Sequence, residues 1–207
     1  MTPKEFNNYF NVSRETISDF CVYENLLKKW NIRKNLVSKK SLPHVWRRHF
    51  LDSAQIVNHC NPEKKLWVDM GAGAGFPGVV IAIILRDRGI KTDLVLVEKS
   101  SNKVFFLNEL KRSLDLSFDV ICGKAEEIKP LKADIISARA FCPLELLLPL
   151  TKYHGKKDCV SIFLKGKNLK EEIDKTSKIW FFQYDILSSV SSDEGRLLKI
   201  KKLYRLT

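Results

Sequence analysis

The chain has 207 residues, of which 44% are hydrophobic and 29% charged, a composition that indicates one globular domain with an extension. The net charge of +12, from 36 basic and 24 acidic residues, favours a polyanionic partner. No charge-free apolar run approaches the roughly 20 residues that a bilayer requires, and the amino terminus has no apolar signal region. We therefore expect a cytoplasmic protein that does not enter a membrane.

The first part of the chain, residues 1–64, predicts a helical extension. Ser13 is suited to cap a helix that carries apolar side chains at helical spacing as far as Trp30, and Ser41 followed by Pro43 predicts a second helix through Phe50. We expect the rest of the chain, residues 65–207, to form the main domain.

The extension contains a basic stretch between positions 28 and 48 that has no acidic residue. Basic residues interleaved with Trp30 and Trp46 are typical of contacts with RNA phosphates and bases. The alternative is a solvated face whose tryptophans pack inward, and for the two tryptophans this is the favoured interpretation. The basic residues are Lys28, Lys29, Arg33, Lys34, Lys39, Lys40, Arg47 and Arg48.

Beyond the extension, strands and helices are predicted to alternate. This order favours an α/β fold in which a parallel sheet carries helices on both faces, closed by an antiparallel hairpin over residues 180–188 and 196–204. The strands before the hairpin are predicted at residues 66–69, 93–98, 118–122, 134–138 and 159–164, and the helices at 77–88, 101–114, 144–152 and 168–178.

A glycine-rich turn follows the first predicted strand. Asp69, Gly71, Gly73 and Gly75 lie where the strand ends, and glycines there let the backbone turn tightly and approach a ligand. A dinucleotide site would need a glycine where the chain has Phe76, which argues against NAD. The D-x-G-x-G-x-G pattern resembles instead the first motif of class I methyltransferases, which bind S-adenosylmethionine. A strand-to-helix turn without any ligand is the alternative.

Three further segments are predicted to meet that turn at the carboxyl ends of the strands. Glu98 ends the second strand, where a carboxylate can accept both ribose hydroxyls. Ala125 and Glu126 follow the third strand, where they read adenine or simply begin a helix. Arg139 follows the fourth, and its guanidinium suits a carboxylate or phosphate, unless it forms a surface salt bridge.

Several segments together resemble the glucose-inhibited division protein B family of bacterial methyltransferases, which modify a guanine N(7) in 16S ribosomal RNA. The resemblance implies a Rossmann-like seven-stranded sheet with a terminal antiparallel hairpin. It also implies that Gly71, Phe76, Ala125 with Glu126, and Arg139 contact S-adenosylmethionine. The segments are residues 30–38, 48–54, 68–78, 136–140 and 164–166.

The resemblance further implies that Lys165 and the basic extension face RNA. Many family members have arginine where this chain has Lys124, and lysine keeps the charge but loses the planar fork. The residues expected to bind RNA are Lys28, Arg33, Lys34, Arg47, Arg48, Lys124 and Lys165, and the partner is 16S ribosomal RNA or the small ribosomal subunit, bound by a monomer.

The segment after the fourth strand, Ser137-Ala-Arg-Ala140, lacks the motif that accompanies methylation of an exocyclic amine and the cysteine that pyrimidine C5 methylation needs. A ring nitrogen is then the consistent target. Guanine N(7) has a free lone pair at neutral pH, so we assign no general base, and Arg139 is expected to organise cofactor and target together. The five cysteines are scattered and predict buried packing, not disulfides or a metal site.

Two alternatives compete with the methyltransferase interpretation. One is a NAD-dependent oxidoreductase, which the glycine turn and Glu98 favour and Phe76 opposes. The other is a non-enzymatic RNA-binding module, which the charge alone favours and which leaves the glycine turn unexplained.

Overall fold

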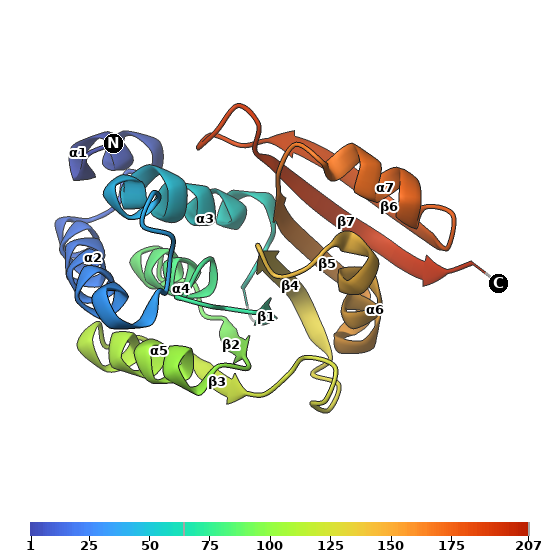
Figure 1. Ribbon diagram of the computed structural model, residues 1–207, viewed down its shortest axis with the longest axis horizontal. Coiled ribbons are helices and arrows are strands. Elements are labelled where there is room, and N and C mark those ends of the chain that lie inside the picture. The colour runs from blue at the N-terminus through green and yellow to red at the C-terminus, as the bar shows by residue number, and fades with distance from the viewer. Residues whose placement is uncertain (64, 207) are drawn as a thin grey trace.

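The computed structural model describes residues 1–63 and 65–206, and its centre is a seven-stranded sheet with helices on both faces (Figure 1). The strand order is β3-β2-β1-β4-β5-β7-β6. Strands β1 to β5 run parallel, whereas β7 is antiparallel to both β5 and β6. The predicted α/β sheet with a terminal hairpin is therefore confirmed. The strands are β1 (Leu66–Met70), β2 (Asp93–Glu98), β3 (Asp119–Cys122), β4 (Ala133–Arg139), β5 (Gly155–Lys165), β6 (Trp180–Ser188) and β7 (Arg196–Arg205).

The helices lie close to the predicted positions. Ser13 caps the long second helix, because its hydroxyl accepts a hydrogen bond from the Thr16 amide at 3.1 Å. No helix among the described residues is both long and apolar enough to span a membrane. The main helices are α1 (Pro3–Phe10), α2 (Arg14–Lys34), α4 (Gly78–Asp87), α5 (Ser101–Ser113), α6 (Leu144–His154) and α7 (Leu169–Thr176).

The second helix predicted in the extension is wrong in detail, since residues 42–59 form four short helical segments of different types instead of one α-helix. A 3₁₀ turn (Leu42–His44) leads into a π-helical segment (Trp46–Leu51), then the short α3 (Asp52–Ala54) and a second 3₁₀ turn (Gln55–His59). A π-helical turn shifts the following side chains around the axis and is common at functional sites. Here it buries His49, Phe50 and Leu51.

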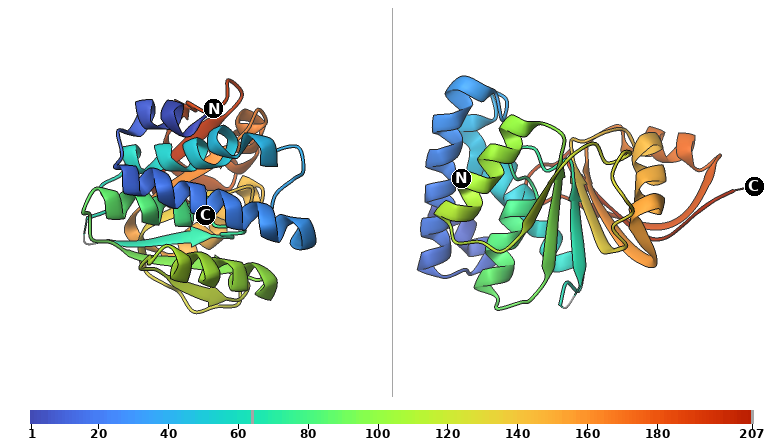
Figure 2. Two further views of the ribbon diagram at one scale, coloured as in Figure 1. Left: turned by 90° about the vertical axis from the view of Figure 1, so that its left-hand side faces the viewer. Right: turned by 90° about the horizontal axis from the view of Figure 1, so that it is seen from below.

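Each face of the sheet has its own hydrophobic cluster. On one face Trp67 of β1 packs in the same cluster as Phe20 of α2, Ile83 of α4 and Phe106 of α5. The other cluster lies under α6 and α7, which cover the β4–β5–β7 part (Figure 2). The extension thus packs directly on the sheet and shares its core. Lys64, the last residue of the predicted extension, and Thr207 lie outside the described residues.

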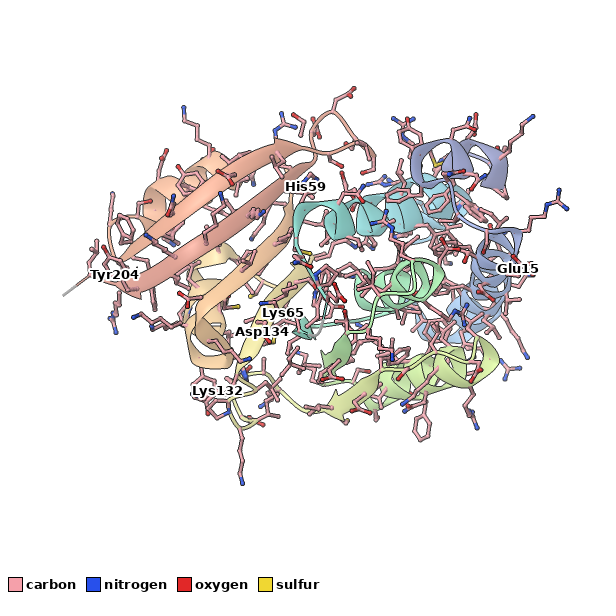
Figure 3. The ribbon with its side chains drawn as sticks, turned by 180° about the vertical axis from the view of Figure 1, so that it is seen from behind. Glu15, His59, Lys65, Lys132, Asp134 and Tyr204 are labelled. Atoms are coloured by element: carbon pink, nitrogen blue, oxygen red, sulfur yellow. The ribbon has the colours of Figure 1, made fainter. Side chains whose placement is uncertain are left out.

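The amino ends of the parallel strands lie at the end of the sheet opposite the glycine turn. Figure 3 shows Lys65, Lys132 and Asp134 near one another there, while Tyr204 marks the end of the hairpin.

All five cysteines are free thiols, and they are less buried than predicted. Cys122 is exposed and the other four are half-buried.

Candidate functional site

The glycine turn joins β1 to α4 and is fixed underneath by a buried carboxyl group. The two carboxylate oxygens of Asp69 accept hydrogen bonds from the Gly78 amide at 2.9 Å and from the Ser137 hydroxyl at 2.8 Å. Burial raises the pKa of Asp69 to about 7, against the lowering effect of these two bonds. Asp69 therefore fastens β1, α4 and β4 together below the turn.

Glu98 holds the turn from the side. Its carboxylate accepts from the Gly73 amide at 2.9 Å and from the Ser100 amide at 2.8 Å, and the residue is only 5% exposed. Among the described residues it forms no salt bridge. Gly73 leaves open space, because a Cβ added there would lie 3.7 Å from its nearest neighbour, the Gly71 carbonyl oxygen. A buried carboxylate with spare acceptor capacity beside open space fits a ligand with vicinal hydroxyls.

Gly71 is needed for a different reason. Its φ is +69°, and a Cβ added there would lie 2.2 Å from Cδ2 of Phe141. Any side chain at this position would therefore overlap the ring. Phe141 comes just after β4 and is half-buried, so its ring forms a wall beside the turn.

The turn after β3 carries the predicted adenine-reading residues. Ala125 is buried, and its carbonyl accepts a hydrogen bond from Nε2 of His154 at 2.8 Å. Glu126 is exposed and lies in a turn, so the alternative that it begins a helix is wrong. Lys124 is also exposed and forms an ion pair with Glu127 at 2.6 Å. His154 was not predicted, although it fixes the carbonyl of Ala125.

Arg139 ends β4 with its side chain 15% exposed and already bound by protein groups. One guanidinium nitrogen donates to the main-chain carbonyl of Arg48 at 2.8 Å and lies 3.3 Å from Asp52. The other donates to Nδ1 of His49. Burial, with the nearby charges of Arg139 and Arg48, lowers the pKa of His49 to about 3, so Nδ1 accepts. The interpretation as a surface salt bridge is wrong, because the pair with Asp52 is largely buried.

The extension supports the glycine turn through aromatic side chains that sequence reasoning missed. The hydroxyl of Tyr23 in α2 donates to the Ala74 carbonyl at 2.5 Å, and its ring stacks on Phe76 with 5.3 Å between centres. His49 also stacks on Phe76, at 4.7 Å. The only indication of this role in the sequence was that His49 lies in residues 48–54, one of the segments that resemble the methyltransferase family. Phe76, a predicted cofactor contact, is itself buried beneath these rings.

Next to the turn lies a groove of about 1400 Å³ at the carboxyl ends of β4 and β5. Its other walls come from the segment 36–52, from α6 and α7, and from the hairpin turn 191–195. The groove reaches Arg139 and Phe141 but not Gly73 or Glu98, so it adjoins the glycine turn without including it. Its lining is mixed in charge. The basic lining residues include His44, Arg47, Arg48, Lys165 and Lys175, and the acidic ones are Asp52, Glu145, Glu171, Glu172, Asp193 and Glu194.

The remaining basic residues differ in how free they are. Arg33 and Arg48 are exposed, whereas Lys28 pairs with Glu24 at 2.7 Å and Lys34 donates to the Asn102 side chain at 3.0 Å. Arg47 is exposed as well, although its Nε donates to the Ser191 carbonyl at 2.9 Å. Lys165 is 9% exposed and does not project freely into solvent.

The two tryptophans pack inward, as the favoured interpretation predicted. Trp46 is 5% exposed and donates to Glu24 at 2.8 Å. Trp30 packs against Phe106.

A parallel sheet closed by an antiparallel hairpin, with a glycine turn after β1 and an acid at the end of β2, defines the class I methyltransferase fold. Solved structures agree. A SAM-dependent methyltransferase from Aquifex aeolicus superposes with a TM-score of 0.58 at 12% identity, over 84% of this chain and 97% of that one. The TYW2 protein of M. jannaschii, solved in complex with AdoMet, gives 0.56 at 14% identity, over 84% and 80%.

The sequence comparisons identify the family within this fold class. The family model described as GidB, rRNA small subunit methyltransferase G, matches residues 16–200, and the chain belongs to this family. The ribosomal RNA small subunit methyltransferase G of Ruegeria pomeroyi is 39% identical over 199 residues, which cover 96% of this chain and 97% of the relative. The resemblance stated from the motifs is confirmed, and neither the oxidoreductase nor the non-enzymatic module is favoured.

Proposed function

We propose that this protein transfers a methyl group from S-adenosylmethionine to N(7) of a guanine in 16S ribosomal RNA. The observation that carries the proposal is the glycine turn held by Glu98 directly beside a large groove lined by basic and acidic side chains, with Arg139 and Phe141 at their junction. The family membership and the fold support the same conclusion. The groove then receives the target base.

In this proposal the residues around the glycine turn hold the cofactor. Glu98 accepts from the ribose hydroxyls, Gly73 leaves room for close approach, and the turn at Ala125 and Glu126 lies against the adenine. When bound, S-adenosylmethionine supplies an electrophilic methyl group. Phe76 does not face this site openly, and its part is to support the turn from below.

Guanine N(7) needs no proton removed before it attacks, so positioning is the main contribution of the protein. Arg139 connects the end of β4 to Asp52, His49 and the Arg48 carbonyl, and thereby holds the groove wall against the turn. We therefore propose that Arg139 organises cofactor and target mainly as a positioning residue, through its contacts with the protein.

The exposed Arg47 and Arg48 line the groove, and together with the exposed Arg33 of α2 they bind RNA phosphates in this proposal. Lys124 keeps a charge at the rim, although its ion pair with Glu127 shares that charge. A ribosomal RNA substrate places the protein in the cytoplasm, and we propose that it acts as a monomer.

Two measurements test the proposal. Titration calorimetry should show binding of S-adenosylmethionine and none of NAD. Incubation with methyl-labelled S-adenosylmethionine should label the RNA of small ribosomal subunits and leave large subunits unlabelled. Label in ribosomal protein, or in neither subunit, would contradict the assigned substrate.

A further inference from the structure

An ion pair in the groove has hydrogen-bonding capacity that the fold leaves unused. Lys165, at the end of β5, lies 2.7 Å from Glu172 of α7, and both side chains line the groove. Their side chains are 9% and 26% exposed. Leu164, the residue before Lys165, pairs with Arg139 of β4, so this pair sits one strand away from the junction with the glycine turn.

The two groups use only part of their capacity. The Lys165 ammonium donates to Oε2 of Glu172 and, at 3.2 Å, to the Cys142 carbonyl, which leaves one N–H. Oε2 of Glu172 also accepts from the Leu144 amide at 2.6 Å. Its other oxygen, Oε1, has no partner within the described part of the chain. The pair therefore presents one donor beside one free carboxylate oxygen.

A guanine whose N(7) must remain free for methylation can be recognised on its Watson–Crick edge. That edge presents the O6 acceptor next to the N1–H and N2–H₂ donors. The pair in the groove has the complementary order, a donor from Lys165 and an acceptor from Glu172. Adenine presents an amino donor in place of O6 and an unprotonated N1, so it would meet Lys165 and Glu172 with the wrong groups.

A purely structural role would be to fasten α7 to α6 and β5. However, Lys165 and Glu172 are both partly withdrawn from water, and this cost offsets part of their attraction, so the pair is a weak source of stability. The oxygen that the structural contacts leave free borders the groove, where it can accept from water or from a bound base.

We propose that Lys165 and Glu172 recognise the Watson–Crick edge of the target guanine, with Lys165 donating to O6 and Glu172 accepting from N1–H and N2–H₂. This inference rests on the proposed function and adds the residues that select guanine. It makes the groove the place where the target base is read.

The test compares RNA that carries guanosine at the mapped target position with RNA that carries inosine there, since inosine lacks only the N2 amino group. The wild-type protein should prefer guanosine in kcat/KM by about tenfold or more, the size of one specific base contact. Equal rates on both RNAs would overturn the inference without any variant. If the wild-type protein methylates no small-subunit RNA, the proposed function fails as well, so the two failures are distinguishable.

The variant Glu172→Gln makes the test specific to the side chain. The Leu144 amide and Lys165 both require an acceptor, so the Gln oxygen stays with them and the amide NH₂ faces the base donors. The preference for guanosine should fall to within about twofold, the range left once the contact is lost. Glu171→Gln is the matched control, because Glu171 is an exposed neighbour on α7 with the same charge change.

Affinity for S-adenosylmethionine should be unchanged in both Gln variants, which shows that the fold is intact. A preference for guanosine that survives in a folded, active Glu172→Gln protein would overturn the inference. So would an equal loss of preference in Glu171→Gln.

Discussion

The guanidinium of Arg139 lies over the ring of Phe76, with its central carbon 5.0 Å from the ring centre. Through this contact the end of β4 touches the glycine turn, and His49 stacks on the same ring. The extension, the turn and β4 are thus joined at one point.

Replacing Arg139 by lysine should strongly reduce methyl transfer while the protein still folds. Lysine keeps the charge but cannot reach the Arg48 carbonyl, Asp52 and His49 together, nor stack as a plane on Phe76. We expect kcat to fall by about 100-fold, in line with the cost of losing positioning. Single-turnover kinetics would measure this, and normal turnover in Arg139→Lys would contradict the role.

Replacing Gly71 by alanine should destabilise the protein and abolish cofactor binding. The matched control is Gly89→Ala, since Gly89 has φ +65° and no atom within 4 Å of an added Cβ. It should cost about 1 kcal/mol from backbone strain alone. Gly71→Ala adds the overlap with Phe141, so its loss in urea unfolding should be clearly larger. The double variant Gly71→Ala/Phe141→Ala should recover part of the difference, and equal losses in the two single variants would refute this reasoning.

Glu98→Gln should weaken binding of S-adenosylmethionine about tenfold or more, because hydrogen bonds to a charged acceptor are each about 1.5–3 kcal/mol. The Gly73 and Ser100 amides donate to different oxygens of Glu98, so in the variant one of them would face the NH₂ group instead of an acceptor. Titration calorimetry measures the affinity. Glu126→Gln is the comparison, since Glu126 is exposed. A larger loss of affinity in Glu126→Gln than in Glu98→Gln would show that the ribose contact is misplaced.

His49 should make stability depend on pH. Burial lowers its pKa to about 3 from an ordinary 6.5, so the unfolded chain takes up the proton first. This contribution to stability is complete above pH 6.5 and is lost as the pH falls toward 3, by about 2 kcal/mol at pH 5. Asp69 acts in the opposite direction, because a pKa raised to about 7 stabilises the fold as the pH falls.

The His49 contribution must therefore be taken from the difference between the wild-type protein and His49→Gln. That difference in urea-unfolding free energy should change by about 2 kcal/mol between pH 7 and pH 5. The exposed His44 provides the control variant His44→Gln. A constant difference between the wild-type protein and His49→Gln over this range would contradict burial of an uncharged His49.

The sequence predicted the sheet, the glycine turn and the inward packing of Trp46 because each depends on local pattern. Strand alternation, glycine spacing and helical periodicity are all readable in one stretch of chain. The partners of Arg139 were not readable, since His49 and Asp52 come from a π-helical segment whose register departs from 3.6 residues per turn. Tyr23 and Glu172 were missed for a related reason. Their partners, Ala74 and Lys165, lie on other elements that only the tertiary fold brings near.

The exposed arginines of the extension should account for much of the salt dependence of RNA binding. Replacing Arg33, Arg47 and Arg48 by glutamine should lower the slope of log affinity against log salt by about 2, if each contacts one phosphate of single-stranded RNA. The control replaces three exposed lysines near the amino ends of the strands, at the end of the sheet opposite the glycine turn. They are Lys91, Lys132 and Lys157. Equal slopes for the two triple variants would contradict an RNA surface on the extension.

The central claim is tested most directly by locating the methyl group on the RNA. After reaction with small ribosomal subunits, borohydride reduction and aniline cleave the chain wherever a guanine carries a methyl group on N(7). We predict one new cleavage at a single guanine of 16S ribosomal RNA, absent when the protein is omitted. Transferred methyl label without any such cleavage would place the methyl group on another atom and contradict the account.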